Sequence, residues 1–286
     1  MIEVTPTDTE RASEAFEEAR LRVLVEAIRE DGFVVIEDVV DHAHLDLLTE
    51  RMEQDLVAIR KLPRVSHNFV WGNVQQHPPP FEPFVFRDVV ANPFVCQVTS
   101  AVLGEGAFMN GMTGNTNLPG SSIQPVHTDD GQLWPDLEVA TPAYELVVNI
   151  ALEDTTLENG AIELWPGTHL DVGQVVGQDI RVPEEAVERR REVVPAVRGT
   201  TRKGSVLIRD KRMWHRGMPN TSDRIRFMVA MVHCIRWLDR KPRYALERGC
   251  AAVFEGCPIE ATMPFVDDPG DEYLKLPRPY AYDGPN

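Results

Sequence analysis

The chain has 286 residues, and 43% of them are hydrophobic, which is enough to bury a full core in one large domain. Because 45 acidic residues outnumber 29 basic residues, the formal charge of −16 disfavours nucleic acid and anionic membranes as partners. The N-terminal stretch lacks the basic and apolar regions of a secretory signal, and no apolar run is long enough to span a membrane, so we expect a cytoplasmic protein.

Helical patterns dominate the first part of the chain, about residues 9–104. The predicted helices cover 9–29, 41–62 and 92–104, with a short strand over 33–36. Gly32 ends the first helix, because glycine readily adopts the left-handed conformation that often follows a helix. Asp41 is the expected N-cap of the second helix, which Pro63 stops. Asn92 caps the third helix, which ends at Gly104.

Strand patterns replace the helical ones after residue 105. Short β-prone runs, separated by glycine, proline and asparagine, cover 144–152, 161–165, 205–208 and 227–237. Regular short strands of this kind predict a closed double sheet of the jelly-roll type. The expected fold is therefore mainly β with flanking α-helices, in a single domain over 1–286. Its jelly-roll core would span about 105–240, and a C-terminal extension would cover 241–286.

Two further features of the chain concern its loops and its thiols. The segment over 64–83 holds the run Pro78-Pro79-Pro80 and is expected to be an irregular loop that acts as a lid over the barrel. The four cysteines form no C-x-x-C pair, so neither a zinc ribbon nor a redox motif is indicated. We expect free thiols, and the alternative is a disulfide between Cys250 and Cys257.

The most informative motif is His127-Thr128-Asp129, which is followed by His215 and, eleven residues later, by Arg226. Two imidazoles and one carboxylate occupy one face of an octahedral metal and leave the opposite face open, as in non-haem Fe(II) oxygenases. The arginine adds a partner for the far carboxylate of a dicarboxylic co-substrate. In an extended segment, residues two apart lie on the same side, so His127 and Asp129 can bind one metal ion.

A second H-x-D motif, His44-Leu45-Asp46, provides an internal comparison. It lies in a stretch with helical periodicity, where side chains two apart point to nearly opposite sides of the helix. We therefore predict that only the first motif chelates a metal.

Four stretches of the chain resemble the phytanoyl-CoA dioxygenase family of Fe(II)/2-oxoglutarate oxygenases. They are DGFVVIEDVV at 31–40, VHTDDG at 126–131, ENGAIELWPGTH at 158–169 and KGSVLIRDKRMWHRGMPNTSDRIRF at 203–227. The resemblance extends to about residue 237 and implies a double-stranded β-helix core, cupin-like, with helices packed outside. It also implies Fe(II) as cofactor, 2-oxoglutarate and O2 as co-substrates, and hydroxylation as the usual outcome.

The same resemblance assigns roles to single residues. The implied iron ligands, and thus the catalytic centre, are His127, Asp129 and His215. Arg226 would bind the C5 carboxylate of 2-oxoglutarate, and Asn149 would be a further co-substrate contact. Related halogenases have a small residue at the place of Asp129, so the carboxylate in this chain disfavours halogenation.

Alternatives remain for the neighbours of these residues. Arg224 shares a strand face with Arg226 but lies beside a turn, from which it can reach solvent more easily. Asp130 could replace Asp129 as ligand, but its side chain should point to the other face of the strand. Gly217 departs from the family, which commonly has a hydrogen-bonding residue there, so a secondary co-substrate contact at this position is not expected.

Other residues have both a functional and a structural interpretation. Trp134, Trp165 and Trp214 could line a substrate cavity, although aromatic residues near a barrel more often belong to the core. The cluster Arg189–Arg191 could hold the phosphates of an acyl thioester, but the surrounding glutamates favour a solvated face. His169 is assigned a structural role.

We therefore expect an Fe(II)- and 2-oxoglutarate-dependent hydroxylase of a small organic metabolite that releases succinate and CO2. The alternative is a non-catalytic jelly-roll module that binds a metal or a small ligand. Arg226 argues against this alternative, because a binding module needs no clamp for a co-substrate. The sequence leaves open the substrate, its free or thioester form, the oligomeric state, and the choice between hydroxylation, desaturation, cyclisation and epimerisation.

Overall fold

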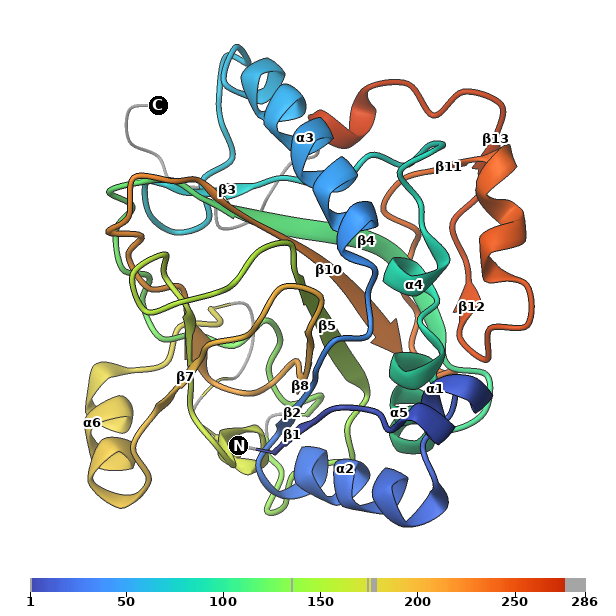
Figure 1. Ribbon diagram of the computed structural model, residues 1–286. Helices are drawn as coiled ribbons and strands as arrows, with labels where there is room; N and C mark the ends of the chain where they lie inside the picture. The colour runs from blue at the N-terminus through green and yellow to red at the C-terminus, as the bar shows by residue number, and fades with distance from the viewer. Residues whose placement is uncertain (1, 135, 174, 176–178, 276–286) are drawn as a thin grey trace.

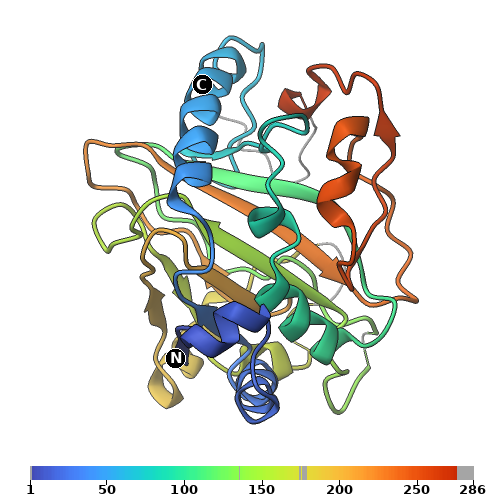
Figure 2. The ribbon, with the colours of Figure 1, turned by 45° about the vertical axis from the view of Figure 1, so that its right-hand side comes forward.

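The computed structural model describes residues 2–134, 136–173, 175 and 179–275. Most helices lie on one side of a large mixed sheet, and a smaller sheet lies on the other side, with α6 (Glu184–Val193) beside it (Figures 1 and 2). Within the described ranges, no helix has the length and apolar character needed to cross a membrane. The arrangement of the two sheets and the helices confirms the predicted fold class, which is mainly β with flanking helices and a jelly-roll core.

The main sheet has eight strands in the order β1-β2-β8-β5-β10-β4-β12, with β3 paired to β4 off this path. Its strands are β1 (Glu3–Val4), β2 (Phe33–Ile36), β3 (Asn73–Gln75), β4 (Phe108–Asn117), β5 (Glu145–Ala151), β8 (Val206–Asp210), β10 (Arg226–Cys234) and β12 (Glu260–Ala261). Neighbouring strands run antiparallel, except that β1 is parallel to β2 and β12 is parallel to β4.

Side-chain alternation gives the central strands two different faces. On β5, Leu146, Val148 and Ile150 belong to the apolar core beneath the helices. Val147 and Asn149 point the other way and line a cavity inside the barrel. All of β5 is therefore buried, because one face completes the core and the opposite face builds the site.

The smaller sheet is ordered β7-β6-β9 and covers the opposite side of this cavity. Its strands are β6 (Ile162–Leu164), β7 (Val197–Gly199) and β9 (His215–Arg216). His127 extends this sheet through isolated bridges to Arg181 and His215. A separate pair of short strands, β11 (Leu246–Glu247) and β13 (Phe265–Val266), lies in the C-terminal extension.

The helices confirm two of the predicted caps and correct one predicted element. The α-helices are α1 (Asp8–Ser13), α2 (Glu18–Glu30), α3 (His42–Ile59), α4 (Arg87–Val90), α5 (Pro93–Leu103) and α6 (Glu184–Val193). The 3-10 helices are η1 (Thr168–Leu170), η2 (Arg248–Phe254) and η3 (Glu272–Leu274). Asp41 caps α3 by accepting the N–H of Ala43, and Asn92 caps α5 with Pro93 in the first turn.

The prediction of one helix over 9–29 is wrong, because the chain reverses between α1 and α2. Glu14 ends α1 in the left-handed conformation, with φ of 51°. The buried carboxylate of Glu10 holds this reversal together, since it accepts the backbone N–H groups of Thr7 and Glu17. The helical periodicity of the sequence does not reveal this reversal.

The five predicted strands are confirmed as β2, β5, β6, β8 and β10, but β4 was not predicted. Its sequence, FMNGMTGNTN, contains few β-branched residues and two glycines. Pairing with β10 on one side and with β3 and β12 on the other stabilises it as a strand. The segment over 64–83 is irregular as expected, apart from β3 within it.

The four cysteines are free thiols, as predicted, and the alternative disulfide between Cys250 and Cys257 is not formed. The Sγ atom of Cys257 instead lies 3.2 Å from Sγ of Cys96, which belongs to α5. This contact places the C-terminal extension against the helical layer.

Candidate active site

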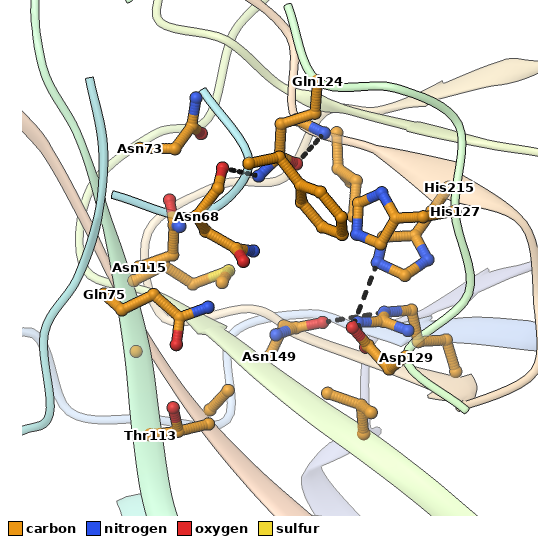
Figure 3. Close-up of a pocket in the computed structure, with 18 of the residues that line it drawn as sticks. Asn68, Asn73, Gln75, Thr113, Asn115, Gln124, His127, Asp129, Asn149 and His215 are labelled. Atoms are coloured by element: carbon orange, nitrogen blue, oxygen red, sulfur yellow. Dashed lines mark hydrogen bonds and ion pairs between the residues drawn. The ribbon is translucent and has the colours of Figure 1, made fainter. Parts of the chain in front are cut away.

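Backbone pairing brings His127 and His215 together. The N–H of each residue donates to the carbonyl of the other, at 2.9 Å in both directions, and the two ring centroids lie 4.3 Å apart. Asp129 follows on the same side of the extended segment, with its N–H bonded to the carbonyl of Lys211. One donor atom from each of His127, Asp129 and His215 lies within 4.8 Å of the others, and the three face one cavity (Figure 3).

Hydrogen bonds orient both imidazoles for metal binding. Nδ1 of His127 lies 2.9 Å from the carbonyl of Pro125, and Nδ1 of His215 lies 2.9 Å from the carbonyl of Met213. Because a carbonyl can only accept, Nδ1 carries the proton and Nε2 keeps a free lone pair. Burial lowers the pKa of both imidazoles below the usual range, so the rings are neutral at pH 7 and able to bind a metal.

Asp129 is held by a cation that the sequence analysis did not identify. Burial alone would raise the pKa of this carboxyl group, but Arg209 and the two imidazoles hold it well below the usual range. Nη2 of Arg209 lies 2.5 Å from Oδ2 of Asp129, while Oδ1 of Asp129 lies 3.6 Å from Nε2 of His215. Arg209 was detectable as a basic residue within the strand sequence VLIRD, which is buried throughout.

The second H-x-D motif forms no such group, as predicted. His44 lies on α3 and pairs with Asp88 at 2.9 Å, whereas Asp46 pairs with Lys203 at 2.5 Å. Asp130 likewise points away from the three donor residues, since its carboxylate pairs with Arg240 at 2.5 Å.

A cavity of about 270 Å³ lies in front of the three donor residues, between the two sheets. The wall across from them carries amide and hydroxyl side chains from the 66–72 loop, β3 and β4 (Figure 3). We call this group the amide wall, and its members are Asn68, Asn73, Gln75, Thr113 and Asn115. The amide wall was not predictable from the sequence, because its residues are brought together only by the pairing of β3 with β4.

The two candidate arginines of the last core strand occupy different environments. Arg226 lines the cavity and is only 7% exposed, whereas Arg224 is exposed to solvent. Burial lowers the pKa of Arg226 to about 10, against an opposing effect of Glu153, so the guanidinium remains positive at pH 7. Its Nε has no hydrogen-bond partner among the described residues. Asn149 lines the same cavity, where its Oδ1 accepts a hydrogen bond from Nε of Arg209.

Gly217 lies where a side chain would collide with two polar groups. A Cβ atom at this position would be 2.6 Å from Oε1 of Gln124 and 3.0 Å from Oδ1 of Asn73. Gln124 accepts the N–H of Gly217 and donates to the carbonyl of Asn68, so both polar atoms of its side chain are engaged with the backbone.

The remaining residues of interest are structural. Trp165 and Trp214 are buried in a satellite core, whereas Trp134 is 55% exposed, and none of the three lines the cavity. Nε2 of His169 lies 3.0 Å from the carbonyl of Arg29, as expected for a structural role. In the cluster Arg189–Arg191, two guanidinium groups are engaged within the protein, since Arg190 donates to the carbonyl of Pro166 and Arg191 packs over Trp165.

Comparison with known proteins agrees with this architecture. The sequence model of the phytanoyl-CoA dioxygenase family matches residues 28–228. Two relatives, uncharacterized proteins of Mycobacterium bovis and Mycobacterium tuberculosis, are each 28% identical over 235 residues, which is 78% of this chain and 79% of theirs.

Solved structures show the same fold. SnoK, a non-heme alpha-ketoglutarate-dependent carbocyclase from nogalamycin biosynthesis, gives a TM-score of 0.60 at 21% identity, over 80% of this chain and 86% of its own. AviO1 from Streptomyces viridochromogenes gives a TM-score of 0.56 at 21% identity, over 79% of this chain and all of its own length, 100%.

Proposed function

Because the chain belongs to the phytanoyl-CoA dioxygenase family of Fe(II)- and 2-oxoglutarate-dependent oxygenases, we propose that it hydroxylates a small organic metabolite and releases succinate and CO2. One observation carries the proposal: the three donor residues and Arg226 line the same cavity. A non-catalytic jelly-roll module would have no use for a buried arginine without a partner at its Nε.

The donor set fits Fe(II). His127 and His215 would bind through Nε2, since each Nδ1 is committed to a backbone carbonyl, and Asp129 would bind through Oδ1. Such commitment of the second ring nitrogen is usual for metal-binding histidines. Two neutral imidazoles and one carboxylate leave the other coordination positions for the co-substrate and O2.

The residues of the chain would bind, orient and shield the reactants. When bound, Fe(II) with 2-oxoglutarate and O2 supplies an oxidant that can remove a hydrogen atom from a C–H bond. Arg226 would hold the C5 carboxylate of 2-oxoglutarate in a site from which water is excluded. Phe69 covers His127 with a centroid distance of 4.5 Å, and its backbone has a φ of 63°, which is unusual for a bulky residue.

The amide wall supports a polar substrate. The side chains of Gln75, Thr113 and Asn115 line the cavity and form no hydrogen bond to the described part of the chain, so their donors and acceptors can serve a ligand. Apolar side chains, among them Ile162, Ile180 and Val232, line other parts of the cavity and can contact the carbon skeleton of such a substrate. We therefore propose a small metabolite with several hydrogen-bonding groups, with the C–H bond to be oxidised directed toward the three donor residues.

The experiment that tests the proposal is anaerobic titration of the purified protein with Fe(II) and 2-oxoglutarate. We expect the weak visible charge-transfer band of the chelate, and we expect His127→Ala or His215→Ala to abolish it. His44→Ala is the matched control, because that residue belongs to the H-x-D motif on α3. Absence of the band in the unchanged protein would refute the proposal.

The type of reaction requires a second measurement. Metabolites that stimulate succinate release should be analysed by mass spectrometry after turnover. A product that gains one oxygen atom supports hydroxylation, whereas a product that loses two hydrogen atoms indicates desaturation or ring closure.

A further inference from the structure

Arg209 connects the metal-binding carboxylate to the interior of the main sheet. It lies on β8, where Val206 and Ile208 face the helical core and Arg209 faces the cavity. Only 4% of its surface is exposed, so its charge is almost fully withdrawn from water. Burying a guanidinium group is costly unless it is paired, and Asp129 is the carboxylate that pairs with it.

The pairing gives the two carboxylate oxygens of Asp129 different partners. Oδ2 of Asp129 accepts from Nη2 of Arg209 at 2.5 Å, which leaves Oδ1 as the oxygen facing the imidazoles. A carboxylate held in this way offers a metal one oxygen and cannot rotate freely to offer both.

The same guanidinium also orients Asn149. Its Nε donates to Oδ1 of Asn149 at 3.3 Å, and Nε–H can only donate. The amide oxygen is thus directed to Arg209, and the NH2 group of Asn149 becomes the donor available to a molecule in the cavity.

We propose that Arg209 is a positioning residue that fixes Asp129 as a ligand through one oxygen and orients Asn149 as a donor. The inference rests on the proposed role of Asp129 as a metal ligand. Arg209 makes no hydrogen bond to either imidazole, although its charge helps burial to lower the pKa of both, so Asp129 is the donor residue that it holds directly.

The first test measures the dissociation constant of Co(II), without 2-oxoglutarate or turnover, for the unchanged protein, Arg209→Met and Arg209→Lys. We expect Arg209→Met to weaken binding about 10- to 100-fold, as is typical for loss of a group that orients a metal ligand. Arg209→Lys should recover part of the loss, because it restores the charge without the planar fork. Arg212→Lys is the control for a buried arginine paired with a carboxylate away from the cavity, and it should bind Co(II) normally.

The second test replaces the carboxylate by a small ligand from solution. In Asp129→Gly, formate should enter the vacated space between Arg209 and the metal and restore Co(II) affinity. In the double variant Asp129→Gly, Arg209→Met, formate should restore much less. Equal restoration in the two variants would overturn the proposal, as would unchanged Co(II) affinity in both Arg209→Met and Arg209→Lys.

These outcomes are distinguishable from failure of the proposed function. If the unchanged protein forms no Fe(II)–2-oxoglutarate chelate, the assignment as an oxygenase with this triad fails. If the chelate forms but Co(II) affinity is insensitive to Arg209, only the positioning role fails.

Discussion

Arg226 and Arg224 are two residues apart on the chain but occupy opposite environments, and this difference permits a direct test of co-substrate binding. Arg226→Leu should raise the KM for 2-oxoglutarate strongly, because removal of one partner of a buried ion pair costs roughly 2 to 5 kcal/mol. Arg224→Ala should change this KM little, since its side chain is exposed to solvent. Steady-state succinate release at varied 2-oxoglutarate gives both values, and the reverse order of effects would contradict the assignment.

Asp129 and Asp130 form a second matched pair. Asp129→Ala removes the proposed anionic metal ligand and leaves the buried charge of Arg209 without its carboxylate, so both metal affinity and activity should be lost. Asp130→Ala should retain most activity, because that carboxylate pairs with Arg240 and Lys211. Metal content and succinate release should be measured for both variants, and an active Asp129→Ala beside an inactive Asp130→Ala would refute the ligand assignment.

Removal of Asp129 should also create a binding site for halide. The vacated space lies beside the Arg209 guanidinium, which needs an anion in a buried setting. Thermal stabilisation of Asp129→Ala by chloride or bromide, compared with the unchanged protein, measures this effect. We do not expect the variant to transfer the halide to a substrate, because halogenation also requires the substrate to be positioned toward the halide.

The contact between α5 and the C-terminal extension brings the thiols of Cys96 and Cys257 within reach of each other. The hydrogen bond with Cys96 lowers the pKa of Cys257, whereas burial raises the pKa of Cys250 to about 11. Thiolates are the reactive form, so Cys257 should react first with glutathione disulfide. The hydrogen bond to Cys257 is the main cause that raises the pKa of Cys96, and modification of Cys257 removes it. Cys96 should then displace the glutathione, giving a Cys96–Cys257 disulfide and two molecules of reduced glutathione in all.

Peptide mapping after this treatment tests the pairing. A peptide that links Cys96 with Cys257 is expected, and Cys96→Ser should instead retain glutathione on Cys257. A Cys250–Cys257 link, or no link, would contradict the expectation. Cys234 is an internal control, because burial raises the pKa of its thiol and it should stay unmodified.

Elements with a strong local signal were predictable from the sequence. Asp41 and Asn92 cap their helices as expected, because an N-cap depends on the side chain and the next few backbone groups. Strand β4 was not predictable, since its Asn- and Gly-rich sequence forms a strand only through its pairing with β10. Local pattern therefore indicated elements with a strong local signal, and it missed β4, which depends on its neighbours.

The same distinction applies to the site. His127 and Asp129 were predictable, since their spacing and extended backbone suffice to place them on one side. His215 and Arg226 followed from the residue types that such a site needs, and the family resemblance assigned them the same roles. Arg209 and the amide wall were missed, because their positions depend on the register of β8 against β5 and of β3 against β4. Register is a tertiary property that short sequence windows do not contain.

Buried histidines make the free energy of unfolding of the protein depend on pH. Burial lowers the pKa of His233 to about 4, compared with about 6.5 in an unfolded chain. Between these values the unfolded state binds more protons, so the free energy of unfolding must fall as the pH falls. His233 alone should contribute a loss of about 2 kcal/mol between pH 7 and pH 5.

Urea unfolding at pH 7 and pH 5, in the presence of a metal chelator, measures this loss. His233→Gln should show a smaller difference between the two pH values than the unchanged protein. The imidazoles of His127 and His215 act in the same direction, because burial lowers their pKa as well, so a smaller slope should remain. An equal difference in both proteins would contradict the contribution of His233.

The reciprocal backbone bonds between His127 and His215 have a consequence for how the protein acquires its metal. Folding, and not coordination, places the imidazoles side by side, so the entropy of bringing two distant segments together is already lost before any ion arrives. The centre is thus preorganised, and ions that favour different geometries meet the same arrangement of donors. Discrimination between iron and its competitors would then depend on which metal the cell supplies, more than on any adjustment of the site.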